Sequence, residues 1–291
     1  MPYKADMEYC LLLIETHIGE DITPKWLAEK LGYSFFHFCH IFRICNDVPV
    51  GEYIRRRKLQ LASTELVQGK KITEIAMDFG YDTPSGFSKA FRKEFGMSAQ
   101  EYRLGRKGTG ELKTKGEVSM EPRLVKKDSF KAIGYAIAPR KGEHINVLES
   151  GAYWQGADFS AVSSEVYAQV GKDSEGEIGA WYHPADESGN LIYFFGAIVN
   201  ESKSVPAGLM ALDIPAATYA VFTTEPVDTT KDDRALQAVI RKTWKMIFLQ
   251  WFEDSEYEFD KEKFDFEFYD ERCSDREKAM IDIYIPVKRK G

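Results

Sequence analysis

The sequence predicts two domains of different fold class, an all-α double helix-turn-helix domain followed by an α+β domain of two pseudo-symmetric β-β-α-β-β halves. Three observations support this: a helical unit repeats within the first 105 residues, a Gly- and Lys-rich segment follows, and a repeated alternation of strands and helices fills the remainder. A length of 291 residues fits two domains of ~100–200 residues each. The expected boundaries are 1–106 for the helical domain, 107–120 for a flexible linker and 121–291 for the second domain.

Charge is divided unevenly between the two parts. Residues 1–127 carry 21 Lys and Arg against 17 Asp and Glu, whereas the remaining residues carry 18 against 29. A mildly basic first part suits a polyanionic partner, and an acidic second part suits a cation. No apolar run approaches the ~18 residues of a membrane helix, and neither a secretory signal nor a CxxC pair is present. We expect a cytoplasmic chain without a membrane partner.

Helix-capping residues divide the first domain into short helices. A residue with a side-chain oxygen followed by proline, as in Thr23-Pro24 and Thr83-Pro84, is typical of a helix start. Glycine after the last apolar position is typical of a helix end. A long helix is expected between Pro49 and Gln68. The expected caps of the other helices are Thr23, Ser34, Thr73, Thr83 and Ser98, and the expected core aromatics are Phe38, Phe42, Phe87 and Phe91.

The helical unit occurs twice. AEKLGY at residues 28–33 recurs as AMDFGY at residues 76–81, an offset of 48, and Phe42-Arg43 recurs as Phe91-Arg92, an offset of 49. Each copy is a short helix, a turn with glycine and a second helix, which is the helix-turn-helix pattern. The long helix between the copies spans about 30 Å. That length is close to the ~34 Å between successive major grooves on one face of DNA.

Two polar segments of this domain allow more than one interpretation. Residues 55–58 read Arg-Arg-Arg-Lys, which could contact phosphates or could be a solvated helix face. His37, Cys39 and His40 resemble a metal patch, but a zinc site usually needs four ligands and no partner pair accompanies them. We therefore expect no metal and no cofactor.

Residues 20–104 resemble the DNA-binding domain of the AraC/XylS family. Residues 75–103 match the family signature almost throughout, including IAMDFGYDTPSGFSKAFRKEFG at 75–96. The resemblance implies double-stranded DNA and RNA polymerase as partners. Arg43, Arg55, Lys58 and Arg92 are expected to make further DNA contacts. The family's base-reading positions fall on Phe36, His37, Cys39 and His40 in the first unit and on Ser85, Gly86, Ser88 and Lys89 in the second.

The second domain alternates strands and helices in two rounds. Residues 123–125 and 132–137 are expected to form a hairpin, and residues 159–170 a helix. The place where two such halves meet is a natural ligand site. The remaining expected strands are 178–182, 191–199, 209–213, 218–223, 264–269 and 280–287, with a long helix at 232–252.

The second domain contains FKAIG at 130–134, GAWY at 179–182 and FEFY at 266–269. With these pieces, residues 121–289 resemble the GyrI-like effector-binding domain. The resemblance implies a pocket between the halves for aromatic, often cationic compounds, with Glu267 as the matching glutamate. A carboxylate among aromatic rings attracts organic cations. The expected aromatic neighbours are Trp181, Tyr182, Tyr193, Tyr153 and Trp154.

Other interpretations remain open for these residues. Glu267 could lie on the solvated face of an antiparallel sheet, and Tyr153, Trp154 and Trp244 could belong to the core. The preferred function is a ligand-responsive transcription regulator without catalytic residues. The alternatives are a GyrI-like hydrolase of a reactive small molecule, for which neither GxSxG nor HExxH is present, and a drug-binding sequestration protein.

Overall fold

The structure, a computed structural model, describes residues 3–103, 121–137, 159–171, 174–182, 192–232 and 234–290. Contacts between Cα atoms divide the chain into two compact units. One comprises Ala5–Glu117, and the other comprises Val118–Gly291 with Met1–Lys4. None of the helices in the described ranges combines the length and the apolar character that a membrane-spanning segment needs.

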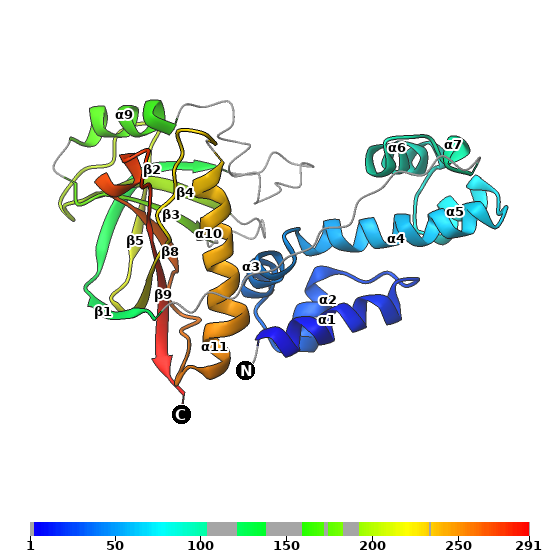
Figure 1. Ribbon diagram of the computed structural model, residues 1–291, viewed down its shortest axis with the longest axis horizontal. Helices are drawn as coiled ribbons and strands as arrows, with labels where there is room; N and C mark the ends of the chain where they lie inside the picture. Colours follow the sequence, from blue (N-terminus) through cyan, green and yellow to red (C-terminus); the bar gives the residue numbers. More distant parts are fainter. Residues whose placement is uncertain are drawn as a thin grey trace. The chain divides into compact units, whose positions relative to one another are not determined.

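The first unit is all-α, as predicted. Its helices form two groups, which the long helix α4 connects (Figure 1). Polar side chains cap three helices at the expected residues: Thr23, Ser34 and Thr83 accept hydrogen bonds from backbone N–H groups three residues ahead. The helices are α1 (Tyr3–His17), α2 (Pro24–Leu31), α3 (Phe35–Asn46), α4 (Val50–Val67), α5 (Ile72–Asp78), α6 (Pro84–Phe95) and α7 (Ala99–Arg103).

Two further cap predictions had different outcomes. Ser98 forms a reciprocal capping box with Glu101, because its hydroxyl accepts from the Glu101 N–H at 3.2 Å and the Glu101 carboxylate accepts from the Ser98 N–H at 2.8 Å. The predicted cap at Thr73 is wrong. The capping position lies two residues earlier, at Lys71, which offers no side-chain acceptor, and helix α5 begins at Ile72.

Each helix-turn-helix unit has its own pair of buried phenylalanines. Phe38 and Phe42 on α3 and Phe87 and Phe91 on α6 are fully buried, as predicted. In the second helix-turn-helix copy, Phe87 and Phe91 pack with Leu59 and Leu66 of α4 and with residues of α5. The duplicated positions are therefore buried packing positions of α3 and α6, the second helix of each copy, which we call the recognition helices.

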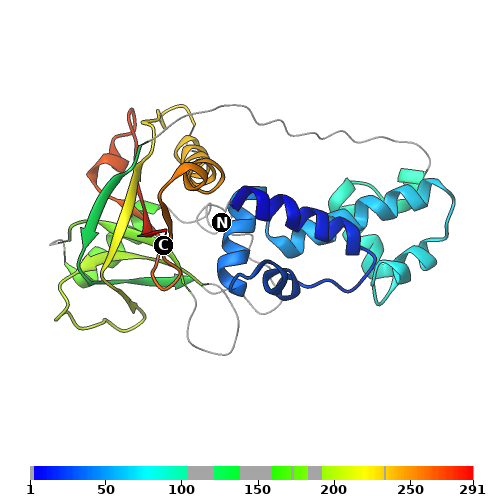
Figure 2. The same ribbon diagram turned by 90° about the horizontal axis from the view of Figure 1, so that it is seen from below.

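The second unit is an α+β domain around one antiparallel sheet, as predicted. Helix α10 runs alongside the strands in Figure 1 and is seen nearly end-on beside them in Figure 2. The order is β1 (Arg123–Lys127), β2 (Phe130–Ile137), α9 (Phe159–Val170), β3 (Glu177–Tyr182), β4 (Ile192–Val199), β5 (Met210–Ile214), β6 (Ala217–Thr223), α10 (Ala235–Met246), the π-helical turn η2 (Ile247–Trp251), α11 (Phe252–Asp254), β7 (Tyr257–Phe259), β8 (Phe266–Tyr269), the 3₁₀ turn η3 (Glu271–Ser274) and β9 (Asp282–Arg289).

Two details of this unit differ from the sequence-based expectation. The predicted helix 232–252 is interrupted, because α10 passes into the π-helical turn η2 before α11. The predicted hairpin of the first two strands is wrong, because β1 pairs with β6 whereas β2 pairs with β4 and β5. The strand order is β1-β6-β9-β8-β3-β4-β2-β5, with β7 on β9. Each half therefore sends its first strand to the edge of the other half.

The strand registers define an internal two-fold relation. Arg123 and Phe130, which begin β1 and β2, correspond to Met210 and Ala217, which begin β5 and β6, an offset of 87 residues. The pair Gly179↔Phe195 in β3 and β4 corresponds to Glu267↔Ile283 in β8 and β9, an offset of 88 residues. Strands β3 and β8 are neighbours in the centre of the sheet, and there Gly179 pairs directly with Glu267. Glu267 thus faces its own counterpart across the axis.

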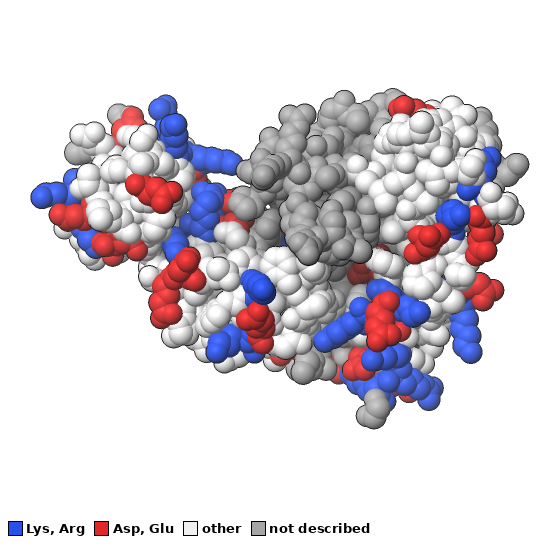
Figure 3. Space-filling view, turned by 180° about the vertical axis from the view of Figure 1, so that it is seen from behind, with Lys and Arg blue, Asp and Glu red and all other residues white. Residues whose placement is uncertain are grey.

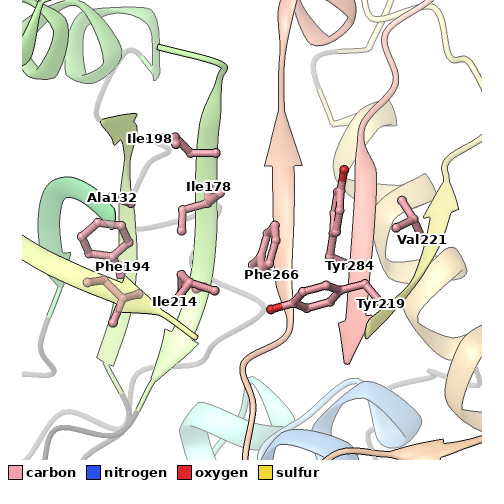
Figure 4. Close-up of a cluster of buried hydrophobic side chains, with 11 residues drawn as sticks. Ala132, Ile178, Phe194, Ile198, Ile214, Tyr219, Val221, Phe266 and Tyr284 are labelled. Carbon is pink, nitrogen blue, oxygen red and sulfur yellow. The ribbon is translucent and has the colours of Figure 1, made fainter. Parts of the chain in front are cut away.

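One face of the sheet carries the main apolar core. Side chains from both halves form it, among them Phe194, Ile178 and Ala132 from one half and Phe266 and Tyr284 from the other (Figure 4). The Phe266 and Tyr284 rings stack with centroids 4.7 Å apart. Because alternate residues of a strand face opposite sides, Glu267 and Gly179 belong to the other face.

Candidate functional site

Helix α6 presents a polar and basic surface. Ser85, Ser88, Lys89 and Arg92 are exposed, and their spacing places them on one side of the helix. Gly86 is exposed beside them. Within the described ranges, no ion pair engages Lys89 or Arg92. Cationic side chains such as Lys89 and Arg92, next to serine hydroxyls, are groups with which a helix can contact phosphates and base edges.

Helix α3 presents a different surface at the corresponding positions. Phe36, His37, Cys39 and His40 are half-buried. Burial raises the pKa of the Cys39 thiol to about 12, so the free thiol keeps its proton near neutral pH. Arg43 departs from the expected DNA contact: only 6% of its surface is exposed, because it lies on the buried side of α3 with Phe42.

The basic run at the start of α4 also differs from expectation. Arg55 donates to the carboxylates of Glu52 and Glu94, and Lys58 donates to the backbone oxygen of Glu20 at 3.3 Å. Arg55 and Lys58 therefore make intramolecular contacts in this structure, and their contacts with DNA phosphates stay a prediction. On the face shown in Figure 3, basic and acidic side chains are interleaved.

In the second unit, the carboxylate of Glu267 is held by two neutral donors. Trp244 of α10 donates its indole N–H to Oε1 at 2.9 Å, and the Tyr269 hydroxyl donates to Oε2 at 2.6 Å. Glu267 is partly exposed, whereas Trp244 is buried with 8% of its surface exposed. Helix α10 covers this part of the sheet face, so Glu267 is not on an open solvated face.

Tyr193 lies beside the same carboxylate. Burial, and then the nearby charge of Glu267, raise the pKa values of Tyr193 and Tyr269 well above their ordinary value. Both phenols therefore keep their protons near neutral pH and can donate to a carboxylate. The Trp181 and Tyr193 rings are 4.8 Å apart at their centroids. The carboxylate therefore lies beside Trp244, Tyr269 and Tyr193, and Trp181 packs against Tyr193.

Gly179 makes room for this arrangement. A Cβ atom at Gly179 would overlap the Tyr193 hydroxyl, and it would lie 3.1 Å from the Tyr193 Cζ and 3.4 Å from Glu267 Oε2. Because Gly179 has no side chain, Tyr193 can lie beside Glu267, the residue with which Gly179 pairs.

Of the predicted effector residues, the structure brings Glu267, Trp181 and Tyr193 together on one sheet face through the pairs Gly179↔Glu267 and Trp181↔Tyr193. Tyr153, Trp154 and the side chain of Tyr182 lie outside the described residues. Trp244 and Tyr269 join the site in addition. Strand alternation places Tyr269, two residues after Glu267, on the same face, and the sequence leaves Trp244 open as either a pocket residue or a core residue.

Comparisons with known proteins agree with both units. Residues 123–287 match the family described as Cass2, integron-associated effector binding protein, and residues 27–105 match a helix-turn-helix domain family. Regulatory protein SoxS of Salmonella typhimurium is 40% identical over 104 residues, which are 35% of this chain and 97% of that protein. HTH-type transcriptional activator AarP of Providencia stuartii is 32% identical over 103 residues, which are 35% of this chain and 76% of that protein.

Among solved structures, SAV2435 bound to tetraphenylphosphonium is 18% identical to this chain, with a TM-score of 0.45, and the match covers 58% of this chain and 94% of that one.

The curated relatives SoxS and AarP are transcription regulators, which are not enzymes. No group of three or more His, Cys, Asp or Glu side chains that could hold a metal ion occurs within the described ranges.

Proposed function

The chain belongs to the AraC-type DNA-binding transcription regulators and to the integron-associated effector-binding (Cass2) family. We propose that its residues 1–106 bind a specific DNA site. We also propose that residues 121–291 bind a small aromatic cation at Glu267. The observation that carries the effector class is the carboxylate that accepts from Trp244 and Tyr269 and lies among aromatic rings. Binding of the cation would then change the affinity for DNA.

The chemistry of the Glu267 site favours a large, weakly hydrated cation. The hydrogen bonds of Trp244 and Tyr269 stabilise the ionised form of the carboxylate without bringing a countercharge themselves. The faces of Trp181 and Tyr193 add attraction through their ring quadrupoles. A small, strongly hydrated ion would gain less here, because it would lose water without filling the aromatic surroundings.

We propose that DNA is read mainly by α6. Its exposed side supplies Lys89 and Arg92 for phosphates or guanine edges, and Ser85, Gly86 and Ser88 for close approach. Helix α3 would add apolar and imidazole contacts through Phe36, His37, Cys39 and His40. As a transcription regulator the protein would act in the cytoplasm beside RNA polymerase, and transcription in vitro with purified polymerase tests that partner.

The effector proposal is tested with two probes of the same shape and opposite charge. The full chain is titrated with tetraphenylphosphonium and with tetraphenylborate, and intrinsic tryptophan fluorescence is followed, because Trp181 and Trp244 belong to the site. We expect saturable binding of the phosphonium only. Glu267→Gln should weaken it by about tenfold to a hundredfold, since a hydrogen-bonded charge contact is worth ~1.5–3 kcal/mol.

Glu256→Gln is the matched control, because Glu256 is an exposed carboxylate that pairs with Arg289 at 3.4 Å. It should bind the phosphonium as the unsubstituted chain does. Equal affinity for both probes, or unchanged affinity in Glu267→Gln, would rule out Glu267 as the charge-recognising residue. Either result would leave DNA binding by residues 1–106 unaffected.

A further inference from the structure

The four basic residues at the start of α4 are divided between the two helix-turn-helix units. Arg57 forms a bidentate pair with Glu15 of α1, with its Nε at 2.6 Å and its terminal nitrogen at 2.7 Å from the two carboxylate oxygens. Lys58 donates to the backbone oxygen of Glu20. These two residues therefore attach α4 to the helical group that contains the first recognition helix.

Arg55 and Arg56 bind in the other direction, to the second recognition helix. Arg55 lies 3.2 Å from the carboxylate of Glu94 on α6, and Arg56 lies 3.6 Å from it. Glu52, one turn earlier on α4, accepts from Arg55 Nε at 2.8 Å and from Arg56 Nε at 2.9 Å. The two arginines and two glutamates form one network between α4 and α6.

The network is partly sheltered from solvent. Only 17% of the Glu94 side chain and 28% of the Arg55 side chain are exposed. Bidentate binding to Glu52 fixes the plane of the Arg55 guanidinium. Ion pairs of this kind are screened less by salt than exposed pairs are. The contact can therefore hold a preferred geometry between the two helices.

Glu94 lies on α6 next to the basic surface of that helix. It lies two residues after Arg92, on the side of the helix that meets α4, whereas Lys89 and Arg92 are exposed. We propose that Arg55 and Glu94 are positioning residues for DNA recognition: their ion pair sets the orientation of α6 on α4, and hence the separation of the two recognition helices, without touching DNA.

The proposal rests on DNA binding by the helical unit. It predicts that Glu94→Gln changes the DNA affinity in the direction opposite to the one that charge alone would give. Replacing Glu94 by glutamine removes a negative charge near a polyanion, and charge alone would then tighten binding. A positioning role predicts weaker binding instead. Loss of a phosphate contact by Arg55 would reduce the slope of log affinity against log salt by about one, whereas a positioning role leaves that slope unchanged.

The test uses the full chain and a DNA duplex that the unsubstituted chain has selected from a random pool. Affinity is measured by fluorescence anisotropy over a series of salt concentrations for Glu94→Gln, Arg55→Gln and the double variant. We expect each single variant to weaken binding by about three- to tenfold, as for a part-buried pair. The double variant should be no weaker than either single one, and the salt slope should not change. Glu74→Gln, which removes an exposed carboxylate of α5 paired with Lys71, is the matched control and should have no such effect.

A second measurement separates positioning from general loss of structure. The duplex is lengthened by one base pair between its two half-sites, and the ratio of the two affinities is compared among variants. The unsubstituted chain should prefer the selected spacing strongly, and Glu94→Gln should prefer it less. Binding in Glu94→Gln that is tighter or unchanged, a shallower salt slope in Arg55→Gln, or an unchanged spacing ratio would overturn the proposal. Failure of the unsubstituted chain to select any duplex would instead count against the proposed function.

Discussion

The helical unit and the sheet unit are both built from a duplicated element, but their copies are joined in different ways. In the helical unit, α2–α3 and α5–α6 remain separate, and α4 connects them. In the sheet unit, the copies exchange their first strands, since β1 pairs with β6 and β5 pairs with β2. Separate copies suit the reading of two DNA grooves, whereas exchanged strands bring the centres of the halves together at one axis.

In both units most of the proposed contacts lie where the copies differ; Arg92 is an exception, because the first copy has Arg43 at the same place. The buried pair Phe38 and Phe42 recurs as Phe87 and Phe91, so the packing is repeated. The exposed Lys89, by contrast, stands where the first copy has His40, at the same offset of 49 residues. Across the sheet axis, Glu267 stands where the other half has glycine. The packing positions are therefore repeated between the copies, whereas most of the residues proposed to contact DNA or the effector are not.

The largest expected effect follows from making the two sheet halves alike. Gly134 pairs with Gly196, whereas the corresponding pair in the other half is Val221 with Tyr284. A Cβ atom at Gly134 would overlap the backbone of Phe195, whose carbonyl carbon would lie 2.7 Å away. Gly134→Ala should therefore destabilise the chain by about 3 kcal/mol or more, the upper end of overpacking costs. Urea unfolding measures the change in the free energy of unfolding. A decrease of less than about 1 kcal/mol would show that the two halves tolerate the same side chains.

A smaller effect is expected at the axis itself. Gly179→Ala places a methyl group against the Tyr193 hydroxyl, and overpacking of this kind costs ~1–3 kcal/mol. It should also abolish phosphonium binding, because Tyr193 must leave Glu267. Adding Tyr193→Phe removes the overlapped oxygen and should restore part of the stability. If the double variant is less stable than Gly179→Ala alone, the glycine is needed for another reason.

The two recognition helices can be compared through their corresponding arginines. Arg92 is exposed on α6, so Arg92→Ala should weaken DNA binding and reduce its salt slope by about one, the signature of a lost phosphate contact. Arg43 is buried on α3, so Arg43→Ala should lower the melting temperature and leave the slope unchanged. Equal reductions of the slope by both variants would mean that both arginines reach DNA.

The smallest expected effect concerns the network that joins the helical copies. Hydrogen bonding from Arg55 lowers the pKa of Glu52 from 4.5 to about 2. Its ionised form therefore contributes stability that is fully present above about pH 4.5 and is lost as the pH falls toward about 2. Melting temperatures across this range should fall more steeply for the unsubstituted chain than for Glu52→Gln. Parallel curves would contradict a stabilising role for the Glu52 carboxylate.

Local signals accounted for most of the fold. The caps at Thr23, Ser34 and Thr83 and the four buried phenylalanines were all expected, because a capping oxygen and a helical apolar stripe depend on residues within one or two turns. Local signals failed at Thr73, which is one of two polar residues near the start of α5, and at β7, a three-residue strand too short for a pattern. They also failed at the predicted β1–β2 hairpin and at the π-helical turn after α10.

The sequence by itself determined the two fold classes, the duplication in each part and the alternation that sets Glu267 apart from Phe266. Only the tertiary structure decided which strands exchange, that Trp244 donates to Glu267, and that Arg55 binds Glu94 39 residues away. The physical reason is range. Periodicity and capping act between near neighbours in the chain, whereas strand partners and ion pairs are selected by whichever groups the folded chain brings into contact.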